Sequence, residues 1–212
     1  MALPQTDTFS GTAGNNIGTD SASWTNDEAS FVYRSGGGAE VNGGTNCSMY
    51  WDDDVPNADQ NVSIITPAVG SRGIGCLTRW ASAGTYYRWW SSNGGSHNEY
   101  SNAGSNNVIS TGNAWAGNSQ VKKVTVIGST ISMYINGSLD TTIGGGDGID
   151  TDANIGSGNF GLYGSGTNST FTYCSSWTGD NEGAAAGQPI IRRFGGVNYM
   201  SRVLGAESLG VF

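Results

Sequence analysis

The sequence predicts an all-β, antiparallel fold, and three observations carry this prediction. Residues 121–143 form β-branched arms separated by Gly-Ser-Thr and by Asn136-Gly137, and the Asn-Gly dipeptide is typical of tight β-hairpins. No stretch carries apolar residues at helical spacing over three turns. The 212 residues include 35 Gly, which together with many Ser, Asn and Thr supply turns between short strands. We therefore predict a sandwich of antiparallel strands.

The alternating pattern of residues 121–143 predicts which side chains are buried. Neighbouring side chains of a strand point to opposite faces of the sheet. The face predicted to pack into the core holds Val124, Val126, Ile131, Met133 and Ile135. The face predicted to meet water or a ligand holds Lys123, Thr125, Ser132 and Tyr134.

Two further predicted strands, residues 73–80 and 85–90, define a candidate ligand-binding surface. Burying an unpaired guanidinium is costly, so we expect Arg79 and Arg88 to face solvent. Arginine can donate paired hydrogen bonds to hydroxyl or carboxylate groups. Residues 91–117, which follow these strands, are polar and are predicted to be rich in loops.

Aromatic residues accompany Arg88 along the second of these strands. Alternation puts Tyr86 and Trp90 on its face and turns Tyr87 and Trp89 inward. Flat aromatic rings can stack on the CH groups of a sugar, or they can cover the sheet or contact another subunit. We predict one outer surface that binds a glycan or a partner protein and consists of Arg79, Tyr86, Arg88, Trp90 and Tyr134.

Several motifs follow one another between residues 6 and 180. They are Asp-Thr-Phe-Ser-Gly at 7–11, Trp24, Gly-x-Gly-x-Leu-x-Arg at 73–79 followed by Thr-Tyr-Tyr, the hairpin at 124–139, and Gly-x-Phe-Gly-Leu-Tyr at 158–163. Their order resembles the concanavalin A-like lectin/glucanase superfamily in its laminin-G-like form. The resemblance implies a jelly-roll β-sandwich of two curved antiparallel sheets, often with a glycan-binding concave face. We expect this domain to span residues 1–183, while a fold of this kind says little about activity.

No catalytic constellation is evident in the sequence. The glucanases that the motifs resemble use Glu-x-Asp-x-x-Glu on one strand, since retaining hydrolysis needs an acid and a nucleophile close together. The five Glu of this chain never form that pattern. His97 and Glu99 could form an acid–base pair, but we interpret their segment as a solvated loop. We therefore predict a protein without enzymatic activity.

A Gly-rich stretch with three carboxylates is the candidate metal site. Asp147, Asp150 and Asp152 offer the oxygen ligands that Ca²⁺ prefers, and the resemblance adds that laminin-G-like domains often bind one Ca²⁺. The run Asp52–Asp54 is a second candidate. The competing interpretation is that Asp residues here serve turns, where they are common. No other cofactor is predicted.

The three cysteines do not form a metal-binding pattern. Cys47, Cys76 and Cys174 show no Cys-x-x-Cys spacing, and the chain has one His, so a zinc or iron–sulfur site is not expected. Cys76 and Cys174 lie in apolar strand patterns, where a free thiol behaves as a small hydrophobic group. A disulfide between these two is the alternative.

The C-terminal segment, residues 184–212, differs from the rest of the chain. The net charge of −8 divides into −10 for residues 1–184 and +2 for residues 185–212. A Gly/Ala-rich linker opens the segment, and we predict an extended arm without regular strand alternation. Its Ile-Ile-Arg-Arg-Phe-Gly-Gly-Val core resembles the C-terminal ends of small structural proteins of tailed phages. The residues expected to dock on a partner are Ile190, Ile191, Arg192, Arg193, Phe194, Tyr199 and Arg202.

Two functions from different classes follow from these observations. The first is a non-enzymatic bacteriophage virion protein, in particular a capsid decoration or cement protein that is anchored to capsid or other virion proteins by its arm. The alternative is a carbohydrate-binding module or phage adhesin that recognises host-surface glycan through the aromatic face. In either case we expect a homo-oligomer.

The expected location is a virion assembled in the host cytoplasm. The first residues lack the basic and apolar regions of a signal peptide. No apolar run approaches the length that spans a bilayer, so membrane insertion is not expected. The acidic body argues against nucleic acid as a partner.

Overall fold

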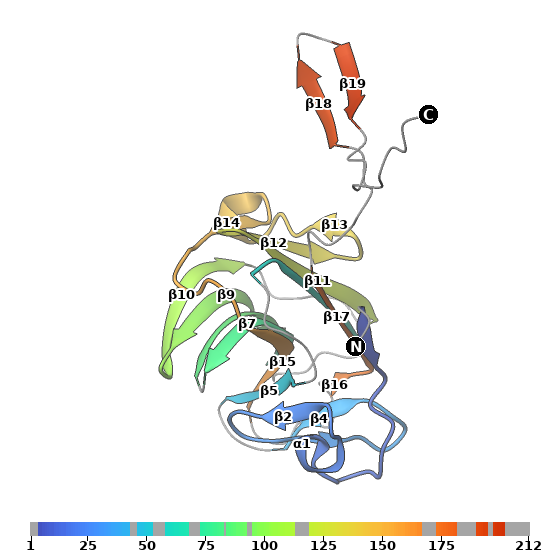
Figure 1. Ribbon diagram of the computed structural model, residues 1–212. Helices are drawn as coiled ribbons and strands as arrows, with labels where there is room; N and C mark the ends of the chain where they lie inside the picture. The colour runs from blue at the N-terminus through green and yellow to red at the C-terminus, as the bar shows by residue number, and fades with distance from the viewer. Residues whose placement is uncertain are drawn as a thin grey trace, which may run out of the picture.

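Two antiparallel β-sheets face each other in the computed structural model (Figure 1). The structure describes residues 4–42, 46–52, 58–67, 73–82, 84–92, 95–112, 119–166, 173–181, 190–194 and 197–201. The predicted antiparallel jelly-roll sandwich is confirmed. Among the described residues, no helix is long and apolar enough to cross a membrane.

The sheet that contains the central hairpin is here called the β11 sheet. Its strand order is β1 (Gln5–Asp7), β17 (Ser176–Asn181), β6 (Gln60–Thr66), β11 (Gln120–Ile127), β12 (Thr130–Ile135) and β13 (Ser138–Leu139). β14 (Ile149–Thr151) also pairs with β12.

The sheet opposite is here called the β8 sheet. Its strand order is β10 (Ser105–Gly112), β9 (Gly95–Asn102), β8 (Thr85–Ser92), β7 (Gly73–Ser82), β15 (Asn159–Ser165), β5 (Cys47–Trp51) and β2 (Trp24–Asn26).

Smaller elements accompany the two large sheets. A third sheet has the order β16 (Tyr173–Cys174), β4 (Ala39–Val41) and β3 (Phe31–Tyr33). A short α-helix, α1 (Ile17–Asp20), and a 3₁₀ turn, η1 (Gly144–Gly146), complete the list of elements before residue 182.

The central hairpin has the predicted register and a buried core face, whereas Thr125, predicted on the face that meets water, is also buried. β11 and β12 pair Val124 with Met133 and Val126 with Ile131, and all four side chains are buried. Ile135 is partly buried against the same core. The Asn136-Gly137 turn has positive φ at both residues, 52° and 83°, as a two-residue hairpin turn requires.

Lys122 shares the core-facing side of β11 with Val124 and is fully buried, at 0% exposure. Its Nζ donates a hydrogen bond to Ser91 Oγ and lies 4.7 Å from the ring centroid of Trp89. Burial holds the pKa of Lys122 well below its ordinary value of 10.5, although the neighbouring Cys76 and Asp140 act in the opposite direction. The core therefore contains an amine that resists protonation.

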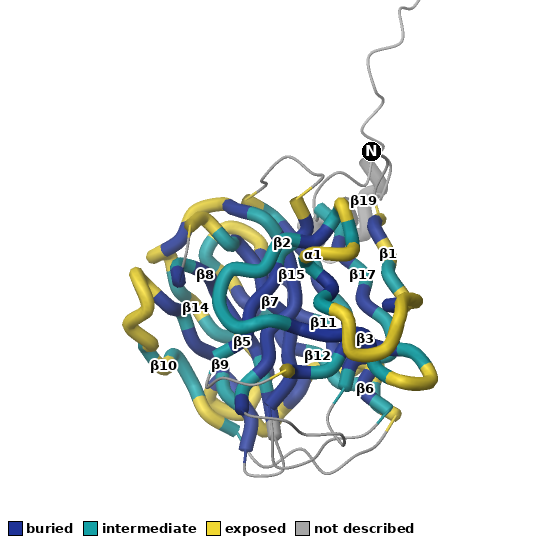
Figure 2. The backbone as a smooth tube through the Cα atoms, turned by 90° about the horizontal axis from the view of Figure 1, so that it is seen from below, coloured by how far each residue is buried: buried dark blue, intermediate teal, exposed yellow. Residues whose placement is uncertain are grey.

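Aromatic rings fill the core between the two sheets, and the backbone of the central strands that enclose it is largely buried (Figure 2). Trp24 meets Trp177 edge to face at 4.7 Å, and Trp51 stacks on Trp177 at 5.3 Å between centroids. The buried indole N–H of Trp177 donates to Gly161 O at 3.0 Å, so this large apolar group is buried without an unsatisfied donor.

The three cysteines form no disulfide and are buried. Burial raises the pKa of the Cys47 and Cys76 thiols to about 12 and raises that of Cys174 as well. Of the two predicted alternatives for Cys76 and Cys174, the structure shows separate thiols, each packed as a small apolar group.

Two predictions about the remaining chain are corrected. Residues 95–102 and 105–112, predicted to lie in loops, form β9 and β10. These polar residues form strands because β8 provides a complete antiparallel partner from Ser92 to Tyr86. Within the predicted extended arm, β18 (Ile190–Phe194) and β19 (Val197–Ser201) pair with each other as a separate two-stranded sheet. Arg202 lies outside the described residues.

Candidate ligand-binding face

The candidate site lies on the face of the β8 sheet that points away from the core, here called the outer face. Residues directly opposite each other in neighbouring strands share a face. One such row runs across five strands and contains Tyr50, Gly161, Leu77, Arg88 and Glu99. The next row contains Tyr163, Gly75, Trp90 and His97. The outer face thus brings together arginine, carboxylate, imidazole and aromatic groups.

Arg88 and Glu99 form a tightly paired ion pair across β8 and β9. Arg88 Nε donates to Glu99 Oε2 at 2.8 Å, and the Nη2 atom lies 2.6 Å from the same oxygen. Arg88 is only 3% exposed. Its burial would lower the pKa of Arg88, but the nearby Tyr163 and Glu99 outweigh that effect and raise it. The charge of Arg88 is therefore fixed, and its position is fixed by its partner.

Trp90 and His97 lie beside this ion pair. Their rings stack with centroids 4.6 Å apart at 15°, and Trp90 Nε1 donates to Glu99 Oε2 at 3.2 Å. A Cβ at Gly73 would come within 2.2 Å of the Trp90 ring, so the glycine makes room for the indole. The His97 side chain remains 30% exposed, and its Nδ1 is 3.7 Å from Glu99 Oε1.

Two tyrosines complete the buried part of the outer face. Tyr86 donates to Glu28 Oε2 at 3.0 Å, and Tyr163 donates to Asn46 Oδ1 at 2.8 Å. The Arg88 guanidinium carbon lies 4.3 Å from the Tyr163 ring centroid. Burial raises the pKa of both phenols, so they stay neutral donors at physiological pH. The buried part of the face is thus tied by hydrogen bonds and is not an open charged surface.

A second aromatic pair lies on the same face further along the sheet. Trp80 stacks on Tyr50 with centroids 3.6 Å apart at 12°, and both residues are partly exposed. The outer face therefore has two partly exposed aromatic pairs, Trp90 with His97 and Trp80 with Tyr50. Between them lie the buried Arg88 and Leu77.

Arg79 does not belong to this face, so its predicted position in the ligand surface is wrong. The strand register shifts between Thr78 and Ser82, and Arg79 has a positive φ of 49°. This β-bulge turns its side chain away from the outer face, and the guanidinium is 2% exposed.

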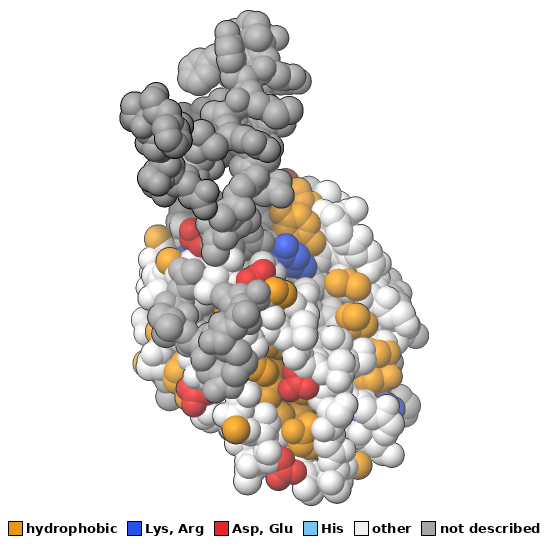
Figure 3. Space-filling model, turned by 45° about the vertical axis from the view of Figure 1, so that its right-hand side comes forward, with side chains coloured by type: hydrophobic (Ala, Val, Ile, Leu, Met, Phe, Trp, Pro, Cys, Tyr) orange, Lys and Arg blue, Asp and Glu red, His pale blue; other side chains and the backbone are white. Residues whose placement is uncertain are grey.

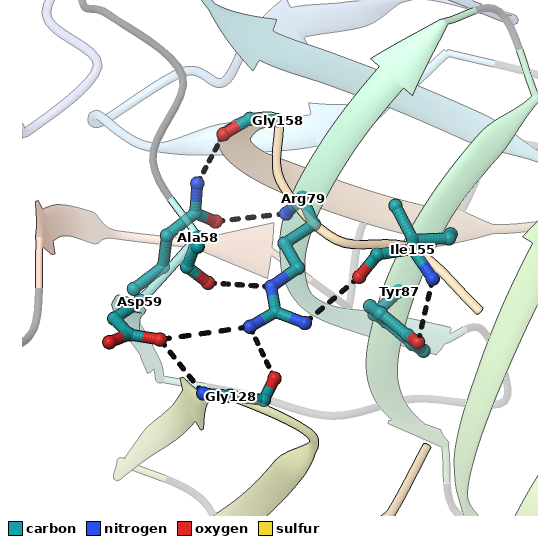
Figure 4. A network of polar contacts seen from close by, with 8 residues as sticks. Ala58, Asp59, Arg79, Tyr87, Gly128, Ile155 and Gly158 are labelled. Atoms are coloured by element: carbon teal, nitrogen blue, oxygen red, sulfur yellow. Dashed lines mark hydrogen bonds and ion pairs between the residues drawn. The ribbon is translucent and has the colours of Figure 1, made fainter. Parts of the chain in front are cut away.

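The Arg79 guanidinium instead joins three loops (Figure 4). It donates to Ala58 O at 2.6 Å, to Ile155 O at 2.9 Å and to Gly128 O at 2.6 Å. Asp59 Oδ1 is 3.9 Å away and also accepts a hydrogen bond from Gly128 N. Burial lowers the pKa of Arg79. These contacts define a structural clasp.

Tyr134 lies on β12, paired with Lys123 and Leu139. It is on the outer side of the β11 sheet, with the sandwich core between it and Tyr86. The prediction that Tyr134 joins the same surface is therefore wrong.

In the view of Figure 3, hydrophobic groups gather in patches among polar side chains, and Lys and Arg are sparse.

The three predicted Ca²⁺ ligands have separate hydrogen-bond partners. Asp147 accepts from Ile149 N at 3.0 Å. Asp150 accepts from Asn98 Nδ2 at 2.7 Å and from Ser110, while Asp152 accepts from Tyr87 and from Asn154 N. Across the described parts of the chain, no group of three His, Cys, Asp or Glu side chains could hold a metal ion. Asp53 and Asp54 lie outside those parts.

Sequence reasoning thus found Tyr86, Arg88 and Trp90 but missed most of their partners. His97 and Glu99 were assigned to a loop, although they alternate with Asn98 and Tyr100 as strand residues do. The signal that could have found them is the Asn102–Ser105 turn, which folds residues 95–102 back on β10. Tyr163 and Tyr50 come from strands distant in the sequence, and no local pattern connects them with β8. Trp80 lies on the neighbouring strand β7, but the bulge at Arg79 breaks the alternation, which would otherwise turn Trp80 to the opposite face.

The comparisons with known proteins concern the fold alone. No family model and no curated protein sequence matches the chain. Among solved structures, the VIP36 exoplasmic/lumenal domain in its Ca²⁺/Man2-bound form is similar at 9% identity and a TM-score of 0.56, covering 94% of this chain and 95% of that one. Carbohydrate-binding module CBM66 from Bacillus subtilis is similar at 12% identity and a TM-score of 0.54, covering 75% and 92%.

These likenesses agree with the sandwich described above, since both compared structures extend over most of its length. At such low identities they establish the jelly-roll architecture and no residue role. The chemistry of the outer face therefore has to be argued from its own contacts.

Proposed function

We propose that this protein binds carbohydrate on the outer face of the β8 sheet and does not cleave it. The observation that carries the proposal is the partly exposed stack of His97 on Trp90, held by the buried pair of Arg88 and Glu99. A sugar offers CH faces that pack on flat rings and hydroxyl groups that bond to polar edges. Both features meet at this stack.

The groups that would contact a sugar are those that reach solvent. His97 presents its imidazole, and Trp80 with Tyr50 forms a second aromatic platform on the same face. Arg88 and Glu99 are nearly buried, so we assign them the role of positioning Trp90 and His97. Glu99 Oε2 accepts hydrogen bonds from both Arg88 and Trp90. Side chains held in this way lose little conformational entropy on binding.

The names of the two similar structures are consistent with this proposal. One is a carbohydrate-binding module, and the other is described with Ca²⁺ and Man2 bound. The transfer to this chain is an analogy of fold and remains to be tested.

A glycan array that covers neutral and acidic sugars tests the proposal, with wild type, His97→Ala and Tyr134→Ala compared at equal concentration. We expect wild type to bind a defined group of glycans and His97→Ala to bind at least about tenfold more weakly. Tyr134→Ala is the matched control, because it removes a partly exposed aromatic ring from the other sheet. We expect its binding to equal that of wild type.

Melting temperatures of the same variants separate binding from folding. The His97 ring is partly exposed and makes one stacking contact, so its removal should shift the melting temperature by only a few degrees. Background binding by wild type across the array would refute the proposal. An equal loss of glycan binding in His97→Ala and Tyr134→Ala would show that the binding surface lies elsewhere.

A place in a bacteriophage virion is a separate proposal that rests on the C-terminal sequence alone. The outer face of the β8 sheet neither requires it nor opposes it, and no comparison supports it. Its test is whether a chain that ends at Asn181 is still incorporated into particles. Undiminished incorporation would show that the arm, including Arg192 and Phe194, is not needed to anchor the protein in a particle.

A further inference from the structure

Strand β10 forms one edge of the β8 sheet (Figure 1). It is eight residues long, Ser105–Gly112, and among the described strands it pairs with β9 alone. Its side chains are exposed or partly exposed along its whole length. An edge strand presents unpaired N–H and C=O groups that can pair with another chain.

The other end strands of the two large sheets, β2, β1 and β13, are protected in the ways that sheet edges usually are. β2 has three residues and is followed directly by Asp27 and Glu28. β1 has three residues and ends at Asp7, and β13 has two and is followed by Asp140. Short length and adjacent charge both discourage edge-to-edge pairing.

Over Ser105–Val108, β10 lacks both of these protections, whereas further along the strand Ser110 donates to the carboxylate of Asp150. The strand is longer, and it contains no charged residue and no proline. No charged side chain occurs between Glu99 and Lys122 in the sequence. Val108 is 57% exposed, the highest value among the exposed large hydrophobic residues. On a chain of net charge −8, this edge can approach an identical edge without repulsion between its own side chains.

We propose that β10 pairs antiparallel with β10 of a second copy of this chain, which joins two β8 sheets into one continuous sheet. The proposal does not depend on glycan binding. The partner is a second copy because a strand of uncharged Ser, Asn, Thr, Val and Ile is complementary to itself, and a two-fold axis repeats every favourable contact. Main-chain hydrogen bonds would supply the affinity, as in other cases of strand addition.

We place the two-fold axis at Asn107, inside the regular part of β10. The register with β9 shifts between Val108 and Ser110, so the regular part of β10 is Ser105–Val108. An axis through Asn107 sets Asn106 of one copy opposite Val108 of the other. Both residues point to the outer face, because their partners on β9 are Ser101 and Glu99.

Antiparallel pairing of this kind keeps the same face of both sheets on the same side. The outer faces of the two copies would therefore form one surface, with His97 and Trp90 repeated on either side of the axis. If the outer face binds glycan as proposed, the dimer would bind a repetitive glycan surface with avidity.

Sedimentation velocity over a range of concentrations tests the dimer. We expect wild type to dimerise and Val108→Lys to dissociate at least about tenfold more readily, because the two ammonium groups would then lie diagonally across the axis and repel each other. Ile127→Lys is the matched control, since Ile127 is 52% exposed but lies on β11 between β6 and β12. It should dimerise like wild type.

A cysteine variant locates the axis. Asn107→Cys should form an intermolecular disulfide under mild oxidation, whereas Ile127→Cys should not, because only the first brings its own copy within bonding range. The native thiols are buried and should not interfere. Wild type that stays monomeric up to about 1 mM, or equal behaviour of the two lysine variants, would overturn the proposal.

Discussion

Arg79 and Arg88 lie on the neighbouring strands β7 and β8, and both were expected in solvent, yet both are buried. Arg79 is 2% exposed and Arg88 is 3% exposed. Arg79 donates to the backbone carbonyls of Ala58, Gly128 and Ile155. Arg88 is paired with a side chain, Glu99, and lies over the Tyr163 ring.

This difference separates a structural cation from one that can support a site. The acceptors of Arg79 belong to three separate loops, so the Arg79 side chain holds these loops together. The partners of Arg88 belong to one sheet face and include the side chains that orient Trp90 and His97. Burial of an arginine alone therefore does not indicate function, whereas the kind and location of its acceptors do.

The largest expected effect is that of Arg79→Met. Three buried or part-buried carbonyl groups lose a charged donor, and each hydrogen bond to a charged group contributes about 1.5–3 kcal/mol. We expect the free energy of unfolding to fall by at least about 4 kcal/mol, measured by urea denaturation. Glycan binding by the remaining folded protein should be unchanged, and a selective loss of binding would show that Arg79 belongs to the site after all.

Glu99→Met should lower the free energy of unfolding somewhat less than Arg79→Met does. A second substitution, at Arg88, should restore most of that stability. Removing one partner of a buried ion pair leaves an uncompensated charge, which typically costs about 3–5 kcal/mol. The double variant Arg88→Met/Glu99→Met removes both charges, so we expect it to recover to within about 1–2 kcal/mol of wild type.

The double variant also separates stability from binding. Because Trp90 Nε1 loses its acceptor in both variants, we expect glycan binding to stay weak after stability has returned. Full binding by the double variant would mean that Arg88 and Glu99 do not position the aromatic stack.

The contrast between the two arginines also shows what the sequence can and cannot predict. Alternation along β8 correctly predicted that Tyr86, Arg88 and Trp90 share a face while Tyr87 and Trp89 are buried on the other. It failed at Arg79 because a bulge with positive φ breaks the period. Nothing in the local sequence marks that bulge.

Tyr134 shows a different limit of the same reasoning. Its outward orientation was predicted correctly, but a strand's period does not say which sheet the strand joins. The β11 and β8 sheets have separate outer faces, and Tyr134 and Tyr86 lie on different ones. The strand that carries His97 and Glu99, β9, does not follow from the sequence because its stability comes from pairing with β8 rather than from apolar alternation.

Lys122 extends the comparison to a buried amine that resists protonation, and its replacement should stabilise the protein. Burial lowers its pKa in the folded state, so below its ordinary pKa the unfolded chain takes up a proton that the folded chain resists. This lysine therefore favours unfolding at neutral pH, and the effect fades as pH rises toward the ordinary value of 10.5.

We expect Lys122→Met to be more stable than wild type at pH 7. Its advantage should shrink with rising pH by up to about 1.4 kcal/mol per pH unit between the folded and unfolded pKa values. Denaturant unfolding at several pH values measures this slope. Lys123→Met, on the opposite face of the same strand, is the control and should show no such dependence. A parallel slope in both variants would contradict the buried-amine explanation.

Arg34 is more exposed than Arg79 and Arg88, and its substitution should have the smallest effect on stability. Its Nε lies 3.8 Å from Glu40 Oε2, with both side chains partly exposed, and its guanidinium carbon lies 4.0 Å from the Tyr173 ring centroid. Pairs of this kind contribute about 0–1 kcal/mol and are screened by salt. Arg34→Met should therefore lower the free energy of unfolding by less than about 1 kcal/mol, and the difference should narrow further as salt concentration rises.

The cost of Arg79→Met should hardly change with salt, because its partners are removed from water. If both costs fell with salt in the same way, the distinction between a buried clasp and a surface ion pair would not hold for this protein.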